Sequence, residues 1–233
     1  MERIEQLHFA TMTTDFPNFR SRRMLMQHIE HTMAFYFPRA IDPSGGFYHF
    51  FMDDGSVYDA HTRHLVSSTR FIFTLAQAYR HFGQAVYLDQ VRHGLQFLRE
   101  VHRNPETGGY AWLLHWPGES GESGEPARVL DGDNHCYGLA FVLLAYAHAL
   151  RAGVAEAREW LEETYDLMEA RFWQAEYGLY ADQASSDWQV VQPYRGQNAN
   201  MHACEAMLAA YAATDDLKFL HRAETLARHI ALR

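Results

Sequence analysis

A glycine-rich motif followed by an aromatic residue occurs three times in this chain, at nearly constant intervals. The motif is GGF at residues 45–47, GGY at 108–110 and, in a weaker copy, YGLY at 177–180. Its glycines at positions 46, 109 and 178 are spaced by 63 and 69 residues, and each interval holds two predicted helices and a short hairpin. A period of this length predicts stacked helical hairpins, because each pair buries its apolar face only against its neighbours.

The periodicity of apolar residues predicts seven helices, which are 18–40, 60–82, 84–103, 132–151, 154–173, 198–213 and 216–231. The closed form of such a repeat is an all-α toroid, the (α/α)6 barrel type, with short β-hairpins at one mouth. Six pairs of helices would need roughly 390 residues at this period. We therefore expect one α/α-toroid domain over residues 1–233, truncated at its C-terminal end and covering the first half to two-thirds of a ring.

Composition and charge exclude several classes of function. The chain carries 20 Lys and Arg against 29 Asp and Glu, a net charge of −9 without a basic cluster, so we expect no nucleic acid partner. No apolar run is long enough to span a membrane, and the start of the chain lacks the pattern of a signal peptide. Cys136 and Cys204 lie far apart without metal-binding spacing, which favours free thiols and a cytoplasmic location.

One segment, residues 196–211, combines a polar line with an apolar stripe. Asn198, His202 and Glu205 stand at i, i+4 and i+7 and share one face of the predicted helix. A second face carries apolar side chains, namely Met201, Cys204, Leu208 and Tyr211. The pattern suits a polar pocket cut into a helical core. The alternative is a capping asparagine followed by a core histidine held by one hydrogen bond.

A polar stripe also marks the predicted helix 60–82, where Arg63, Ser67, Arg70 and Thr74 are spaced by about one turn. On an inner helix, two guanidinium groups would face a cavity and could hold sugar hydroxyls or an enediolate oxygen. The alternative is that each arginine pairs with an aspartate or a helix end.

Aromatic side chains alternate at Tyr110, Trp112 and Trp116, so we expect them on one side of a strand, either stacking on a sugar or packing on helix ends. His135 is expected to cap a helix or to lie in the core. The sequence has no metal-ligand spacing, P-loop, GxGxxG or GxSxG motif, so we expect no metal and no cofactor.

Several of these segments resemble the N-acylglucosamine 2-epimerase superfamily, within it most of all the aldose–ketose isomerase branch of the D-mannose isomerase type. The resemblance covers nearly the whole chain and is carried by five segments, namely GGFY at 45–48, DGS at 54–56, TRHLVSSTR at 62–70, GGY at 108–110 and NANMHACEA at 198–206. It implies an (α/α)6 barrel and a metal-free conversion of an aldose into a ketose, such as D-mannose into D-fructose, through a cis-enediolate.

The resemblance also implies roles for individual residues. Arg63 and His202 would be catalytic, with Arg63 holding the enediolate oxygens. The sugar would be lined by Tyr110, Trp112 and Asn198, and Glu205 would orient His202. In the family, the two histidines that carry the proton come from the second half of the barrel, so His202 would position substrate or assist ring opening.

Three alternatives remain open at this point. One is a 2-epimerase acting on an N-acylglucosamine or a related sugar, and another is a non-catalytic carbohydrate-binding partial toroid. A glycosidase would need two carboxylates across a sugar, but turn and capping roles account for the available acids, Asp53, Asp54 and Asp131–Asp133. The expected partner is a small-molecule sugar, with a homodimer also possible.

Overall fold

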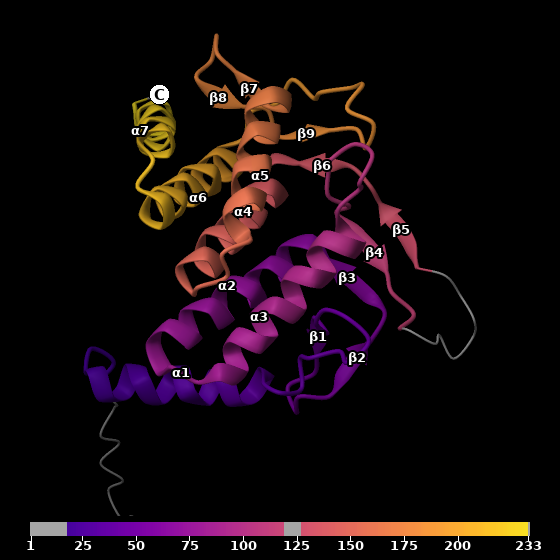
Figure 1. Ribbon diagram of the computed structural model, residues 1–233, viewed down its shortest axis with the longest axis vertical. Helices are drawn as coiled ribbons and strands as arrows, with labels where there is room; N and C mark the ends of the chain where they lie inside the picture. Colours follow the sequence, from indigo (N-terminus) through magenta and orange to yellow (C-terminus); the bar gives the residue numbers. More distant parts are fainter. Residues whose placement is uncertain (1–17, 119–126, 233) are drawn as a thin grey trace, which may run out of the picture. The chain divides into compact units, whose positions relative to one another are not determined.

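The computed structural model describes residues 18–118 and 127–232 (Figure 1). The chain divides into two units after Pro38. The first unit, Met1–Pro38, contains one described helix, α1 (Arg22–Tyr36). Ser21 caps this helix, since its side chain accepts a hydrogen bond from the backbone N–H of Met24. The expected helix 18–40 is confirmed with shorter bounds.

The second unit, Arg39–Arg233, contains three pairs of helices. They are α2 (Leu65–Phe82) with α3 (Ala85–Phe97), α4 (Cys136–Arg151) with α5 (Ala157–Arg171), and α6 (Gln197–Thr214) with α7 (Leu217–Ala231). A five-residue π-helix, η1 (Leu98–His102), continues α3. Helix α4 packs between α2 and α6, while α3, α5 and α7 each pack on the first helix of their own pair. The predicted repeat of helical hairpins is therefore confirmed.

Helix α4 is apolar on every side because it has helices on both flanks and α5 behind it. Every residue from Gly138 to Ala147 is buried. A helix without a polar face is the pattern of a core helix rather than a surface one. Among the helices of the described ranges, none has the length and hydropathy required of a membrane span.

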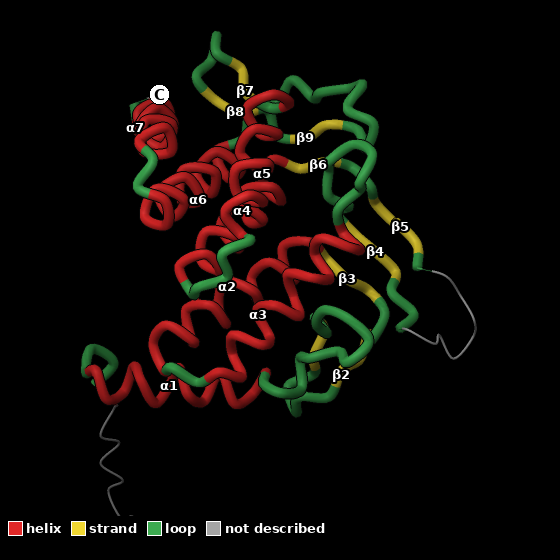
Figure 2. Tube along the Cα trace, viewed as in Figure 1, coloured by secondary structure: helices red, strands yellow, loops and turns green. Residues whose placement is uncertain are grey.

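Short antiparallel strands connect the helices, as Figure 2 shows in yellow. The paired sets are β1 (Phe50–Phe51) with β2 (Val57–Asp59), β3 (Thr62–His64) with β4 (Leu113–His115) and β5 (Arg128–Asp131), β6 (Asn134–His135) with β9 (Gln183–Ala184), and β7 (Trp173–Gln174) with β8 (Leu179–Tyr180). Strand β3 leads directly into α2, and β6 leads directly into α4.

The predicted start of the second helix, at residue 60, is wrong. Residues 62–64 form β3, where Arg63 pairs with Leu114, and α2 begins only at Leu65. His64 is the N-cap of α2, and its Nδ1 accepts a hydrogen bond from the N–H of Val66. Arg63 therefore does not share a helix with Arg70.

Candidate active site

His202 and Glu205 form a hydrogen-bonded pair on α6, as the helical spacing predicts. His202 Nδ1 lies 2.8 Å from Glu205 Oε2. The side chain of His202 is 21% exposed and that of Glu205 is 56% exposed. Because an ionised carboxylate only accepts hydrogen bonds, the Nδ1 atom carries the proton. In the neutral ring, Nε2 is then left with a lone pair for another group.

Two aromatic rings of α4 lie against His202. Its ring is perpendicular to that of Tyr137, with centroids 5.1 Å apart, and lies 4.8 Å from that of Phe141. Tyr137 and Phe141 are one helical turn apart and their rings contact each other at 5.1 Å. The pair fixes the imidazole from the side of α4.

Arg70 reaches the same two rings from α2. Its Nη2 donates a hydrogen bond of 3.2 Å to the hydroxyl of Tyr137, and its Cζ lies 4.7 Å from the centre of the Phe141 ring. A guanidinium and an imidazole from different helices thus meet on α4. We call Arg70, Tyr137, Phe141, His202 and Glu205 the inner cluster.

Trp112 lies beside the inner cluster, between two histidines. Its ring centroid is 4.4 Å from that of His64, 4.2 Å from that of His135 and 6.3 Å from that of Tyr137. Burial lowers the pKa of both histidines, and for His64 the charges of His135 and Arg70 act in the same direction. Since His64 Nδ1 accepts the hydrogen bond of the helix cap, the neutral ring carries its proton on Nε2. The free donor of the His64 ring is therefore its Nε2–H.

A chain of hydrogen bonds supports His64 from behind. The backbone N–H of His64 donates to Nδ1 of His49. Nε2 of His49 lies 3.4 Å from the hydroxyl of Ser68. Ser68 is also 3.1 Å from Nε2 of His102, whose Nδ1 lies 3.0 Å from the carbonyl oxygen of Ala111. The bond from the backbone N–H of His64 requires a neutral His49 ring, and burial lowers the pKa of His102 to about 4. This series of hydrogen bonds joins the first hairpin, α2 and η1.

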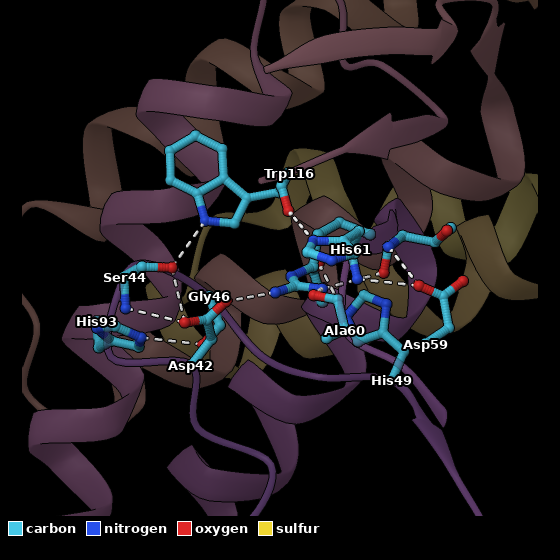
Figure 3. A network of polar contacts seen from close by, with 12 residues as sticks. Asp42, Ser44, Gly46, His49, Asp59, Ala60, His61, His93 and Trp116 are labelled. Atoms are coloured by element: carbon cyan, nitrogen blue, oxygen red, sulfur yellow. Dashed lines mark hydrogen bonds and ion pairs between the residues drawn. The ribbon is translucent and has the colours of Figure 1, made fainter. Parts of the chain in front are cut away.

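Arg63 does not face a cavity, contrary to the expectation from helical spacing. Its side chain is fully buried, and its Nη2 donates to the carboxylate of Asp42. Nη1 donates to the carbonyl oxygen of Ala60 at 2.8 Å. Asp42 also accepts a hydrogen bond from the hydroxyl of Ser44, as Figure 3 shows. The position of Arg63 is that of an anchor for the first hairpin, and the catalytic role given to it is not favoured by this burial.

The three aromatic residues expected on one side of a strand are separated instead. Tyr110 is 2% exposed, and its hydroxyl lies 2.9 Å from that of Tyr146 in the core. The indole of Trp116 donates to the hydroxyl of Ser44. The reason is that β4 begins only at Leu113, so no regular strand runs from Tyr110 to Trp116. Of the three, Trp112 lies beside the inner cluster.

The two asparagines of the NAN motif have different positions. Asn198 is exposed in the first turn of α6, on the face that helical spacing gives to His202. Asn200 is fully buried, and its amide bonds both the N–H and the carbonyl oxygen of Tyr180. Asn200 therefore ties α6 to β8.

Sequence reasoning did not select Tyr137, Phe141 or His64. The available signal was the i, i+4 spacing of two aromatic residues in an otherwise aliphatic helix, and a histidine directly before a helix start. Arg70 was recognised as a candidate but ranked below Arg63. In the described ranges 18–118 and 127–232, no group of three or more His, Cys, Asp or Glu is arranged to hold a metal ion.

A cavity of about 670 Å³ lies elsewhere in the second unit. Its lining comes from residues 100–107 and 109–111, with Val129, Gly132, Asn134 and Ser186, and includes no member of the inner cluster. Glu100, Arg103 and Glu106 give it mixed charge without an arrangement that suits a particular reaction. The inner cluster, which combines an oriented imidazole with a guanidinium, is the better candidate for catalysis.

Comparison with known proteins identifies the family of this chain. The family model for N-acylglucosamine 2-epimerase matches residues 45–233. The chain belongs to this family. The resemblance noted from the sequence is thereby confirmed.

Two relatives named D-mannose isomerase are similar to this chain. The protein from Marinomonas mediterranea is 56% identical over 215 residues, which are 92% of this chain and 52% of the relative. The protein from Thermobifida fusca is 39% identical over 135 residues, 58% of this chain and 31% of the relative. The chain thus spans about half the length of the Marinomonas relative, which agrees with the repeat arithmetic.

Solved structures share the fold. A crystal structure of D-mannose isomerase superimposes with a TM-score of 0.85 at 56% identity, covering 92% of this chain and 52% of that one. A cellobiose 2-epimerase from Bacillus thermoamylovorans B4167 superimposes with a TM-score of 0.75 at 21% identity, covering 87% and 53%. The expected α/α-toroid class is confirmed for the part that this chain represents.

Proposed function

We propose that this chain supplies part of the active site of an aldose–ketose isomerase that converts D-mannose, or a closely similar sugar, into the ketose. The inner cluster carries the proposal, because Arg70 and His202, from separate helices, converge on one pair of rings while Glu205 orients the imidazole. The 56% identity to a protein named D-mannose isomerase supports this choice of sugar.

The reaction moves one proton between neighbouring carbons. A base removes the proton from C2 of the open-chain aldose while O1 gains a proton, which leaves a cis-enediol or enediolate. Reprotonation at C1, with loss of the proton on O2, gives the ketose. The groups required are a base near C1 and C2, donors for the oxygens, and a group that opens the sugar ring.

Arg70 is the donor for the developing oxygen charge in this proposal. Its guanidinium is accessible on the inner cluster, whereas that of Arg63 is buried and neutralised by Asp42. A fixed guanidinium next to two adjacent oxygens stabilises negative charge through paired N–H donors. We therefore transfer the oxygen-binding role from Arg63 to Arg70.

His202 has the supporting role that the family resemblance assigns to it. With its proton held on Nδ1 by Glu205, Nε2 takes the proton of the anomeric hydroxyl and returns it to the ring oxygen as the sugar ring opens. Asn198, on the same face of α6, offers an amide to a sugar hydroxyl. His64 Nε2–H and the indole of Trp112 complete this side of the site.

Product analysis tests the proposal. The protein is expressed from its complete gene and incubated separately with D-mannose, N-acetylglucosamine and cellobiose, and the products are separated by chromatography. An isomerase gives fructose from mannose. Formation of only the C2 epimer from any of the three sugars would identify a 2-epimerase, and binding without turnover would identify a carbohydrate-binding protein.

A further inference from the structure

Tyr137 contacts two ionisable side chains of the inner cluster, those of Arg70 and His202. Its hydroxyl accepts the hydrogen bond of Arg70, and its ring stands perpendicular to that of His202. It lies on the first turn of α4, the helix packed between α2, which carries Arg70, and α6, which carries His202. Tyr137 is thus placed to fix both groups at once.

The ring of Tyr137 is itself held firmly. Phe141 packs against it at 5.1 Å, and Trp112 approaches at 6.3 Å with an interplanar angle of 65°. Its helix is buried from Gly138 to Ala147, so the backbone has little freedom. A hydroxyl on such a ring is a fixed acceptor.

Arg70 needs such an acceptor because it is an exposed, long side chain. A free arginine side chain samples many rotamers, and ordering it during the reaction costs conformational entropy. The guanidinium of Arg70 lies over the face of the Phe141 ring. The hydrogen bond to the Tyr137 hydroxyl then limits how the guanidinium can rotate. The N–H groups that do not face Tyr137 then point in a defined direction.

We propose that Tyr137 is a positioning residue that acts through Arg70, presenting the guanidinium to the two adjacent sugar oxygens. This inference rests on the proposed isomerase function. Because charge on those oxygens develops only along the reaction, loss of the alignment reduces kcat more than it changes KM.

A double-mutant cycle measures this coupling. Tyr137→Phe removes only the hydroxyl, and we expect kcat to fall about tenfold while KM stays within about twofold. In an Arg70→Lys background the same change should alter kcat less than about twofold, because a lysine has no guanidinium plane to orient. An equal loss in both backgrounds, or no loss in either, would refute the proposal.

Tyr146→Phe is the matched control, with the same chemical change on the same helix. The hydroxyl of Tyr146 pairs with that of Tyr110 in the core and does not belong to the inner cluster. We expect this variant to unfold at a lower temperature and to keep kcat. A fall in kcat equal to that of Tyr137→Phe would assign the effect to helix packing and overturn the proposal.

A spectroscopic readout separates this inference from the proposed function. In protein labelled with [15N]arginine, the Nη signals of Arg70 should show slow rotation in the wild type and fast rotation in Tyr137→Phe. Even if no sugar is turned over, that difference would support Tyr137 as the group that orders Arg70. Identical Arg70 signals in the two proteins would exclude it.

Discussion

His202 and Glu205 are joined by a hydrogen bond of 2.8 Å between Nδ1 and Oε2, three residues apart on α6. The carboxylate fixes both the tautomer and the orientation of the ring, and the rings of Tyr137 and Phe141 hold it from the other side. The hydrogen bond to Glu205 therefore occupies Nδ1 and leaves Nε2 of the neutral ring with its lone pair.

The first prediction concerns this pair. His202→Ala should lower kcat/KM on mannose by about 100-fold or more, as expected for loss of an acid–base group. Glu205→Gln keeps an acceptor but removes the charge, and should cost about tenfold. Steady-state kinetics check both, with exposed His81→Ala as the control. Full activity in His202→Ala would remove this residue from the site.

Replacing each of the two arginines of the TRHLVSSTR segment should have opposite effects, one mainly on stability and the other mainly on kcat. Arg63→Leu leaves the buried carboxylate of Asp42 without its partner, so the free energy of unfolding should fall by about 3–5 kcal/mol. Arg70→Leu should change it by less than about 1 kcal/mol, yet lower kcat by about 100-fold. Urea unfolding and kinetics measure both properties. A stable, inactive Arg63→Leu with an active Arg70→Leu would restore the role first expected for Arg63.

The two asparagines of the NAN motif form a second matched pair. Asn200→Ala leaves the N–H and the carbonyl oxygen of Tyr180 without their buried partner, which should cost about 3 kcal/mol of stability. Asn198→Ala, at an exposed position, should unfold like the wild type and raise KM for the sugar. Thermal unfolding together with KM values distinguishes the two effects. Equal stability losses would contradict the difference in burial.

The stability of the fold should depend on pH through His102. Its pKa is lowered to about 4 by burial, against about 6.5 in an unfolded chain. The folded state therefore binds fewer protons, so its full stability is present above about pH 6.5 and is lost as the pH falls toward 4. The loss amounts to about 3 kcal/mol for this one group. Urea unfolding at a series of pH values measures it.

His102→Gln provides the comparison for that pH series. It removes the titrating ring, so its stability should fall less steeply with acid than that of the wild type. His81→Gln, at an exposed position on α2, should keep the wild-type slope. If the slopes of all three proteins coincide, His102 does not account for the acid sensitivity.

Much of the fold could be predicted from the sequence because it is built from local patterns. The seven α-helices of the described residues are long and periodic, and a copy of the glycine motif lies in each of the segments that follow α1, α3 and α5. The face of α6 that carries His202 and Glu205 was predicted for the same reason, since it depends only on spacing along one helix.

The rest depends on contacts between distant segments. Arg63 lies in a three-residue strand that exists because Leu113–His115 pairs with it, some 50 residues away. A pattern read along the chain cannot reveal that pairing, so the sequence alone predicts the start of a helix there. Tyr137 and Phe141 likewise become site residues only when α2 and α6 pack on both flanks of α4.

The most direct test of the central claim is to follow D-mannose deuterated at C2 by NMR in the presence of the enzyme expressed from its complete gene. Proton transfer through an enediolate predicts fructose formation with a primary isotope effect and with deuterium or solvent hydrogen appearing at C1. Arg70→Leu should slow this conversion and Tyr146→Phe should not. Mannose that remains unchanged, or that yields only its C2 epimer, would contradict the account.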